Sequence, residues 1–331
     1  MRPTYMQIAT SAYDRWCRRG GGHGHDQHDW ISAENDLLFA LNYRVIAQIA
    51  LDRPRDGRER RHCRFCERGE PATSFGTEMM PVPEFLGLAA PLARHECDEC
   101  RAQFRTTLDD AFVAFYEPFR LLPTVRGLAA FPSYSWDRWD LGPNPACWSR
   151  ADGTETLVLP SAGHVPIAAF KFLVRLALAA LPETDIDEFA ATLEWVGNPD
   201  HVLDGGAFGG LLVHALLAPR AFPSPWMSLA KKTDEDAPHP TLVALVGHRH
   251  VVFQFAVPLG QGDADLDGEP LTLPTVTLPG GSEGPPYECP HLAIPMDSCE
   301  ERHAAVLELV YRRGVLEELP SLPLALLTLA E

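Results

Sequence analysis

The sequence contains little lysine and no long apolar run. Lysine occurs only at Lys171, Lys231 and Lys232, so arginine carries nearly all of the positive charge. Together with 30 prolines, this is the composition that we expect from a GC-rich bacterial genome. No charge-free stretch is long enough to cross a bilayer, and the N-terminus lacks the apolar core of a signal peptide. We therefore expect a cytoplasmic protein with no membrane partner.

Several common enzyme motifs are also missing from the second half of the sequence. The C-terminal half shows no phosphate-binding loop, no dinucleotide fingerprint and no nucleophile elbow. The 331 residues of the chain are 46% hydrophobic and 22% charged, which is typical of a soluble globular protein with one large domain or two modest ones.

Negative charge predominates and is unevenly spread. The net charge is −17, but residues 1–130 contain 17 arginines and 18 acidic residues, so this part carries −1 and the remainder −16. Phosphate binding requires a basic surface, so the molecule as a whole is not expected to coat nucleic acid.

Four of the eight cysteines form two Cys-x-x-Cys pairs, Cys63/Cys66 and Cys97/Cys100. A thiolate pair with this spacing can direct both sulfur atoms at one ion, and two such pairs make a closed tetrahedral zinc site. Unrelated free or disulfide-bonded pairs are the alternative, but nothing in the sequence indicates secretion. Four sulfur ligands leave no open position on the ion, so the predicted zinc is structural and contributes to folding.

The residues around these pairs form three recognisable segments, Cys63-Arg64-Phe65-Cys66, Pro83-Glu84-Phe85-Leu86-Gly87 and Glu96-Cys97-Asp98-Glu99-Cys100. Together they resemble a bacterial HNH-endonuclease-like family with two CxxC zinc knuckles. The resemblance covers about sixty residues, and a weaker similarity continues through residues 171–178. It implies a treble-clef or ββα-metal unit.

Three positions depart from the family pattern. The resemblance implies a catalytic His where this chain has Met80, an orienting Asn where it has Leu88, and a metal-binding Asn or His where it has Arg101. A thioether takes no proton at neutral pH, an isobutyl group makes no hydrogen bond, and a guanidinium repels a divalent cation. We therefore predict no catalytic residues and no bound cofactor other than zinc.

A rebuilt active site is the alternative to a degenerate one. His62 and His95 lie beside the cysteine pairs, and Glu78 and Glu84 flank the position of the missing base. A His beside a zinc knuckle is more often a surface or supporting residue, and Glu84 after Pro83 suits the start of a helix.

The stretch 53–68 is rich in arginine and is a possible nucleic-acid contact. Its arginines outnumber its acidic residues, and they are Arg53, Arg55, Arg58, Arg60, Arg61, Arg64 and Arg68. The stretch can equally be a solvated arm, or an anchor for the acidic second half of the chain.

The first sixty residues predict one helix, which begins near Ser32 and continues to Ala50 with its apolar residues at helical spacing. We expect this helix to pack on the zinc module. The segment 20–28 before it is rich in Gly and His and reads as a mobile loop rather than a metal site.

Three further helices are expected after the cysteine pairs. They span Thr107–Phe115, Pro166–Leu181 and about Ile186–Val196. In the second of these, an apolar face repeats at helical spacing, while Lys171 and Arg175 lie four residues apart.

From about residue 209 the pattern becomes that of short strands, with an extended piece also at 155–159. The strands are expected at 210–216, 226–230, 242–246 and 251–257, the last two joined in a hairpin, with an edge strand at 271–278 and a helix at 303–312. We interpret His214, His248 and His250 as turn or sheet-surface residues rather than ligands.

The predicted fold class is α+β, with a zinc-bound HNH-like module followed by helices and an antiparallel sheet. We divide the chain into an N-terminal helical arm (1–60), the HNH-like zinc module (61–125) and an α+β C-terminal domain (126–331). Two functions are open: a degenerate nuclease relative that binds a protein or nucleic acid, or a divergent metal-dependent endonuclease with a rebuilt site.

Overall fold

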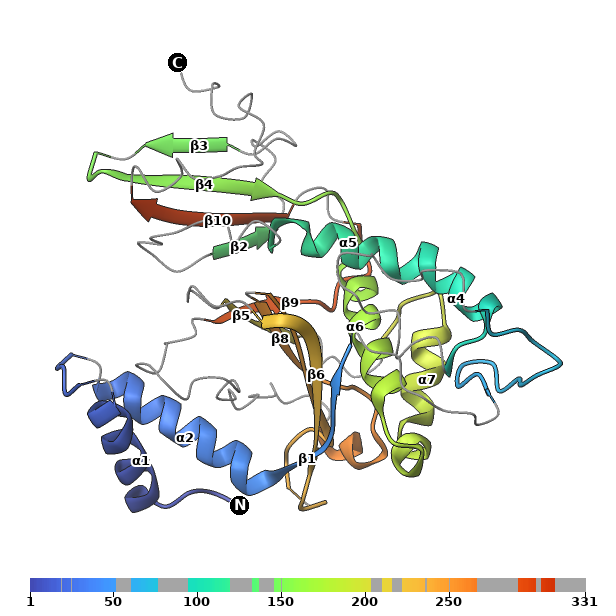
Figure 1. Cartoon of the computed structure of the whole chain (residues 1–331), viewed down its shortest axis with the longest axis horizontal. Helices are drawn as coiled ribbons and strands as arrows, with labels where there is room; N and C mark the ends of the chain where they lie inside the picture. Colours follow the sequence, from blue (N-terminus) through green and yellow to red (C-terminus); the bar gives the residue numbers. More distant parts are fainter. Residues whose placement is uncertain are drawn as a thin grey trace.

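The computed structural model shows a mixed α+β protein with two antiparallel sheets (Figure 1). It describes residues 1–18, 20–24, 26–51, 61–76, 95–119, 133–136, 146–149, 151–203, 210–215, 222–235, 237–249, 251–266, 291–301 and 305–312. Within this part of the chain, no helix is long and apolar enough to cross a membrane.

The larger sheet has six strands in the order β1-β6-β7-β8-β5-β9. Its strands are β1 (Tyr43–Ala50), β5 (Gly210–Ala215), β6 (Phe222–Lys232), β7 (Leu242–Arg249), β8 (Val251–Ala256) and β9 (His291–Pro295). The predicted hairpin is confirmed, since β7 and β8 pair from Val243 with Ala256 to His248 with Val251. Strands at the four positions expected between residues 210 and 257 are likewise present.

The smaller sheet has four strands in the order β2-β10-β4-β3. They are β2 (Ser133–Trp136), β3 (Ala146–Ser149), β4 (Thr154–Pro160) and β10 (Ala305–Arg312). The helix expected at 303–312 is therefore wrong. Its apolar residues suit either a helix or a strand, and pairing with β4, about 150 residues earlier in the chain, decides for the strand.

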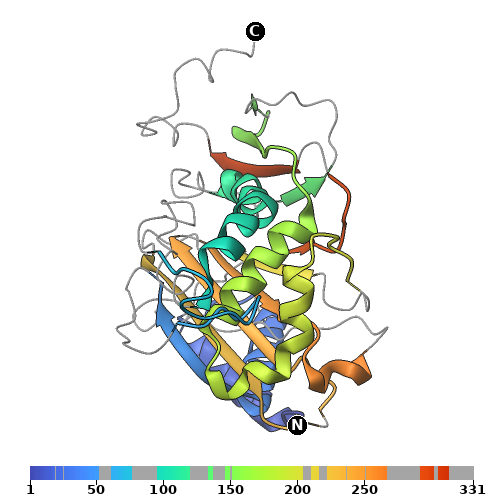
Figure 2. The same cartoon turned by 90° about the vertical axis from the view of Figure 1, so that its right-hand side faces the viewer.

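The helices lie around the larger sheet (Figures 1 and 2). They are α1 (Tyr5–Arg18), α2 (Asp26–Asn42), α4 (Asp98–Phe104), the π-helical η2 (Arg105–Asp109), α5 (Asp110–Tyr116), α6 (Pro166–Ala180), the 3-10 helix η4 (Glu183–Phe189), α7 (Ala190–Gly197) and the 3-10 helix η6 (Gln261–Leu266). The three helices expected after the cysteine pairs are present, although the first continues unbroken from Asp98 and the third begins as η4.

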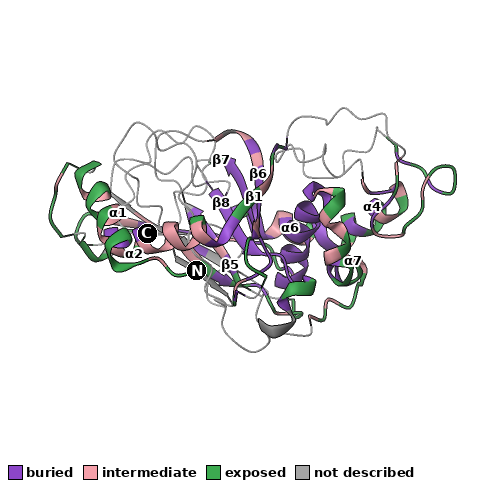
Figure 3. Ribbon diagram, turned by 90° about the horizontal axis from the view of Figure 1, so that it is seen from below, coloured by how far each residue is buried: buried purple, intermediate pink, exposed green. Residues whose placement is uncertain are grey.

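The N-terminal segment differs from the prediction. It forms a hairpin of two helices, and the helix expected to continue to Ala50 ends at Asn42, where the chain enters β1 and pairs with β6. Local apolar spacing cannot show this non-local pairing. The hairpin lies at the opposite end of the molecule from α4, so it does not pack on the cysteine pairs as expected (Figures 1 and 3).

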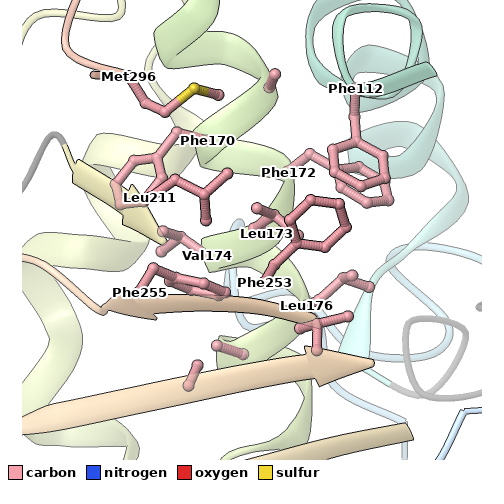
Figure 4. Packing of buried hydrophobic residues seen from close by; sticks show 14 of the residues in the cluster. Phe112, Phe170, Phe172, Leu173, Val174, Leu176, Leu211, Phe253, Phe255 and Met296 are labelled. Carbon is pink, nitrogen blue, oxygen red and sulfur yellow. The ribbon is translucent and has the colours of Figure 1, made fainter. Parts of the chain in front are cut away.

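Helix α6 is the centre of the core. Pro166 starts it with a preset φ, and all 15 of its residues are buried (Figure 3). Its aromatic side chains interleave with those of α5 and the sheet, with Phe172 stacked 4.2 Å from Phe112 and Phe170 edge-on at 5.8 Å to Phe255 (Figure 4). The polar residues Lys171 and Arg175 are buried with the rest of the helix.

Two of the three singled-out histidines are also buried, which corrects the prediction that they lie on a sheet surface. His214 contacts the side chain of Gln254, with Nε2 3.0 Å from Oε1. His248 lies 2.6 Å from the Tyr116 hydroxyl through Nδ1, and burial lowers its pKa to about 4. His250 and the expected strand at 271–278 lie outside the described residues.

We expect Phe172→Ala to lower the free energy of unfolding by about 3–5 kcal/mol, because it removes the ring that stacks on Phe112 and leaves a cavity. The matched control is Tyr13→Ala, since that ring is 61% exposed and its loss should change stability by no more than about 0.5 kcal/mol. Urea unfolding measures both, and equal effects would contradict the assignment of α6 to the core.

Candidate metal centre

The first knuckle, Cys63–Cys66, is held in a tight backbone turn. The amide of Cys63 donates a hydrogen bond to the carbonyl of Arg68 at 2.9 Å, and the amide of Glu67 donates one to the carbonyl of Cys63. Glu67 itself has a positive φ of 56°. The left-handed backbone at Glu67 lets the chain reverse its direction within a few residues of the knuckle.

The second knuckle, Cys97–Cys100, is the start of α4. Cys97 is the N-cap of this helix, with extended backbone, and its Sγ accepts a bond from the Cys100 amide at 3.5 Å. Backbone bonds from Arg64 to His95 and from Asp98 to Ser74, both 2.9 Å, join the two knuckles. We call residues 61–76 and 95–104 the cysteine module.

The two knuckles bring four sulfur atoms together. The Sγ atoms of Cys63, Cys66, Cys97 and Cys100 all lie within 4.8 Å of one another, and those of Cys66 and Cys97 are 3.6 Å apart. Among the described residues, these four are the one group of His, Cys, Asp or Glu that can hold a metal ion. Cys63 and Cys97 are fully buried, whereas Cys66 and Cys100 are partly exposed.

The thiols perturb one another strongly. A hydrogen bond with Cys100 lowers the pKa of Cys63 to about 4, and the same contact raises the pKa of Cys100. Burial raises the pKa of Cys66, although the Nε of Arg68 donates to its sulfur at 3.4 Å. Negative charges on four closely spaced sulfur atoms repel one another, and a divalent cation at their centre reduces this repulsion.

Arg101 occupies the place where the HNH-like resemblance implies a metal ligand. Its guanidinium is buried and donates to the carbonyls of Gly76, at 3.3 Å, and Glu96, at 3.4 Å. It also lies 3.7 Å from the Asp98 carboxylate, which accepts bonds from Ser74 and Gly76. Arg101 therefore braces the two halves of the cysteine module.

The other residues singled out around the module do not assemble into a second site in the described structure. His62 is exposed, and the Nδ1 of His95 lies 3.5 Å from the carboxylate of Glu183. Met80, Leu88, Glu78 and Glu84 lie outside the described residues.

The described arginines of the 53–68 stretch make internal contacts. Arg64 is buried and donates to the carbonyls of Leu178 and Leu181 and, at 2.7 Å, to Glu183. It thereby satisfies carbonyls that the C-terminus of α6 leaves open. Arg61 donates to the Phe75 carbonyl, and Arg68 pairs with Glu99. Arg64 thus acts as an anchor, whereas Arg53, Arg55, Arg58 and Arg60 lie outside the described residues.

A buried ion-pair cluster joins the cysteine module to α6. The guanidinium of Arg175 donates hydrogen bonds to both carboxylate oxygens of Glu96, at 2.6 and 2.7 Å, and to Asp109 at 2.5 Å. The side chains of Arg175 and Glu96 are 0% exposed, and the guanidinium lies over the Phe104 ring at 4.7 Å. This cluster was not predicted from the sequence. An arginine within the apolar run 172–178 and a glutamate directly before Cys97 were the available signals.

Asp109 is the carboxylate of this cluster with the fewest hydrogen-bond partners. Only its Oδ1 is bonded to Arg175, while its buried Oδ2 has no partner among the described residues. Burial raises the pKa of Asp109 to about 7, against the attraction of Arg175, and the charge of Glu96 adds to the increase. One guanidinium cannot fully neutralise two buried carboxylates, so Asp109, which accepts fewer hydrogen bonds from it than Glu96 does, is the carboxylate whose pKa is raised.

Comparison with known proteins adds information at the N-terminus. Residues 3–38 match a family described as "Protein of unknown function (DUF2934)". The matched residues form α1, the turn after it and most of α2. No curated protein and no solved structure is significantly similar to the chain.

Removing Arg175 should destabilise the protein strongly. Arg175→Met leaves Glu96 and Asp109 buried without a counter-charge, and we expect a loss of about 3–5 kcal/mol in urea unfolding. Combining it with Glu96→Gln and Asp109→Asn removes the uncompensated charges and should recover part of the loss. Arg105→Met makes the same change at an exposed position and should have little effect. An equally small loss for Arg175→Met would contradict the cluster's role.

Asp109 should also give the stability a pH dependence. Its pKa of about 7 in the folded chain exceeds the ordinary value of about 3.9, so the folded state holds the extra proton between these values. The contribution is therefore present at low pH and is lost as the pH rises from about 4 to about 7. Asp109→Asn should flatten this part of the stability curve, whereas Asp110→Asn, at the exposed neighbour whose charge is the smallest cause of the raised pKa, should change it only slightly. An unaltered slope in Asp109→Asn would contradict the assignment.

Proposed function

We propose that this chain is a zinc-stabilised, HNH-like protein whose nuclease site is degenerate and which acts as a binding module. The observation that carries the proposal is Arg101. This residue stands where the HNH-like resemblance implies a metal ligand, and in the structure it is committed to the carbonyls of Gly76 and Glu96.

Zinc is the metal that best suits the four cysteines. Thiolate ligands favour zinc over magnesium or calcium, which prefer oxygen. With Zn–S bonds of about 2.3 Å, the sulfur atoms of a tetrahedral site lie about 3.8 Å apart. The 3.6 Å between Cys66 and Cys97 and the 4.8 Å limit for the whole group agree with this spacing. A complete sulfur shell leaves no position for water, so the ion would be structural.

Loss of nuclease activity follows from the chemistry of the replaced residues. A hydrolytic HNH site needs a base and a divalent ion held by uncharged or anionic ligands. A buried guanidinium at Arg101 repels such an ion, and the Met80 side chain takes no proton at neutral pH. A rebuilt endonuclease remains the alternative function, but the described residues offer no second metal-binding group to support it.

A protein is favoured over nucleic acid as the partner. The described arginines of the 53–68 stretch donate hydrogen bonds within the chain, so fewer of their N–H groups are left to bind phosphate. The α1–α2 hairpin, in contrast, exposes large apolar side chains at Tyr5, Met6 and Tyr13, which are 70%, 69% and 61% exposed. Apolar groups gathered on one surface element are typical of protein-binding sites.

Metal analysis tests the zinc site. We expect one zinc per chain in protein purified without chelator, and its loss in Cys97→Ser together with a loss of several kcal/mol in stability. Cys17→Ser, at an exposed cysteine outside the cluster, should keep its zinc. Absence of zinc from the native protein, or a full zinc content in Cys97→Ser, would contradict the proposal.

An activity assay tests the degenerate site. The zinc-loaded protein should not cleave single-stranded or duplex nucleic acid in Mg²⁺ or Mn²⁺, since loss of a general base alone lowers a rate by about 10² to 10⁴. The variant Met80→His/Leu88→Asn/Arg101→Asn restores the family pattern and serves as the comparison. Cleavage by the native protein that is abolished by changing His62 or His95 would instead establish the rebuilt endonuclease.

A further inference from the structure

The four cysteines differ in their access to solvent. Cys63 and Cys97 are fully buried, whereas Cys66 and Cys100 are partly exposed. Cys66 is further distinguished by two neighbours, the Nε of Arg68 at 3.4 Å and the Sγ of Cys97 at 3.6 Å. A small polar oxidant can therefore reach the sulfur atom of Cys66, which has the Arg68 guanidinium and the Cys97 sulfur as neighbours.

We propose that the metal centre responds to peroxide through Cys66, which forms a disulfide with Cys97 and so releases the metal. This inference rests on the structural zinc of the proposed function. A disulfide needs the sulfur atoms about 2.05 Å apart, and a 3.6 Å separation is closed by modest side-chain rotation. Cys97 lies behind Cys66, away from solvent, which suits it to the resolving role.

The reaction balances with hydrogen peroxide as the oxidant. The Cys66 thiolate attacks one peroxide oxygen, the O–O bond breaks, and hydroxide leaves as the sulfenic acid forms. The Cys97 thiolate then attacks the Cys66 sulfur, the S–O bond breaks, and a second hydroxide leaves. The two sulfur atoms lose two electrons to the peroxide oxygens, and two protons from solvent convert the hydroxides to water. A disulfide is a poor metal ligand, so two of four ligands are lost.

Arg68 has a defined part in this reaction. Its guanidinium donates to the Cys66 sulfur and is held in place by its ion pair with Glu99. It therefore lies where negative charge develops on the departing hydroxide, and a hydrogen bond to a charged group contributes about 1.5–3 kcal/mol. Arg68 contacts the reacting atoms without being a metal ligand, so it can be changed while all four cysteines remain.

Oxidation should loosen the cysteine module and leave the core intact. Drawing Cys97 toward Cys66 removes the N-cap of α4, because the Cys97 sulfur then no longer accepts from the Cys100 amide. The Arg175 ion pairs and the packing of α6 involve other atoms and should persist. The expected oxidised state is therefore locally opened and still folded.

Peroxide titration of the zinc-loaded full-length protein tests the proposal. Zinc release is followed with a chromogenic chelator, and the disulfide is mapped by mass spectrometry of unreduced peptides. We expect release of the bound zinc with a Cys66–Cys97 linkage, reversed by a thiol reductant and fresh zinc. In Arg68→Met the release rate should fall roughly tenfold. The double variant Cys17→Ser/Cys299→Ser removes two exposed thiols outside the cluster and should release zinc at the native rate.

The outcomes separate this inference from the proposed function. Protein that contains no zinc as purified would overturn both. Protein that holds zinc but keeps it under peroxide, or that yields a Cys63–Cys100 linkage, would overturn the inference alone. Arg68→Met that binds zinc normally and releases it at the native rate would also overturn it, because the assigned role of the guanidinium would then have no effect.

Discussion

The charge of Arg175 is the constraint on which the rest of this structure depends. The guanidinium lies in a fully buried helix at the centre of the core, so it must be neutralised where no water reaches it. Glu96 and Asp109 provide that neutralisation, and both belong to the chain around the second knuckle. The helix therefore fixes the approach of α4 and α5, while the apolar packing of α6 against the sheet fixes the helix.

Arg64 makes a second contact between the cysteine module and α6, at the C-terminal end of this helix. The last carbonyls of α6 have no partner within the helix, and Arg64 of the first knuckle supplies donors to Leu178 and Leu181. Each knuckle thus contacts α6 through one arginine, and the two knuckles meet at the four cysteines that could hold a metal ion. The cysteine module is consequently coupled to the core, whereas the α1–α2 hairpin at the far end is not part of that coupling (Figure 1).

The elements that were predicted correctly depend on local sequence signals, and those that were missed depend on contacts between distant parts of the chain. The cysteine spacing and the stretch after Pro166 are local, and the structure shows a sulfur cluster and a helix at these positions. Strand β10 and the last turns of the helix expected to reach Ala50 were misassigned, because their apolar residues fit two periods and only pairing with distant β4 or β6 decides between them. The partners of Arg175 lie 79 and 66 residues away, so no window of sequence could connect them.

The same contacts distinguish residues that maintain the fold from residues that would act only in a reaction. A catalytic His or metal ligand contributes to a reaction, and its loss leaves the fold intact unless the residue is also part of the packing. Glu96 and Arg64 take part in the hydrogen bonding of the core, so changing them leaves an uncompensated charge or open carbonyls. Arg101, at a position where the resemblance implies a metal ligand, donates to two backbone carbonyls of the module and so contributes to its fold. The residues that join the cysteine module to α6 are therefore the ones whose substitution the fold should tolerate least.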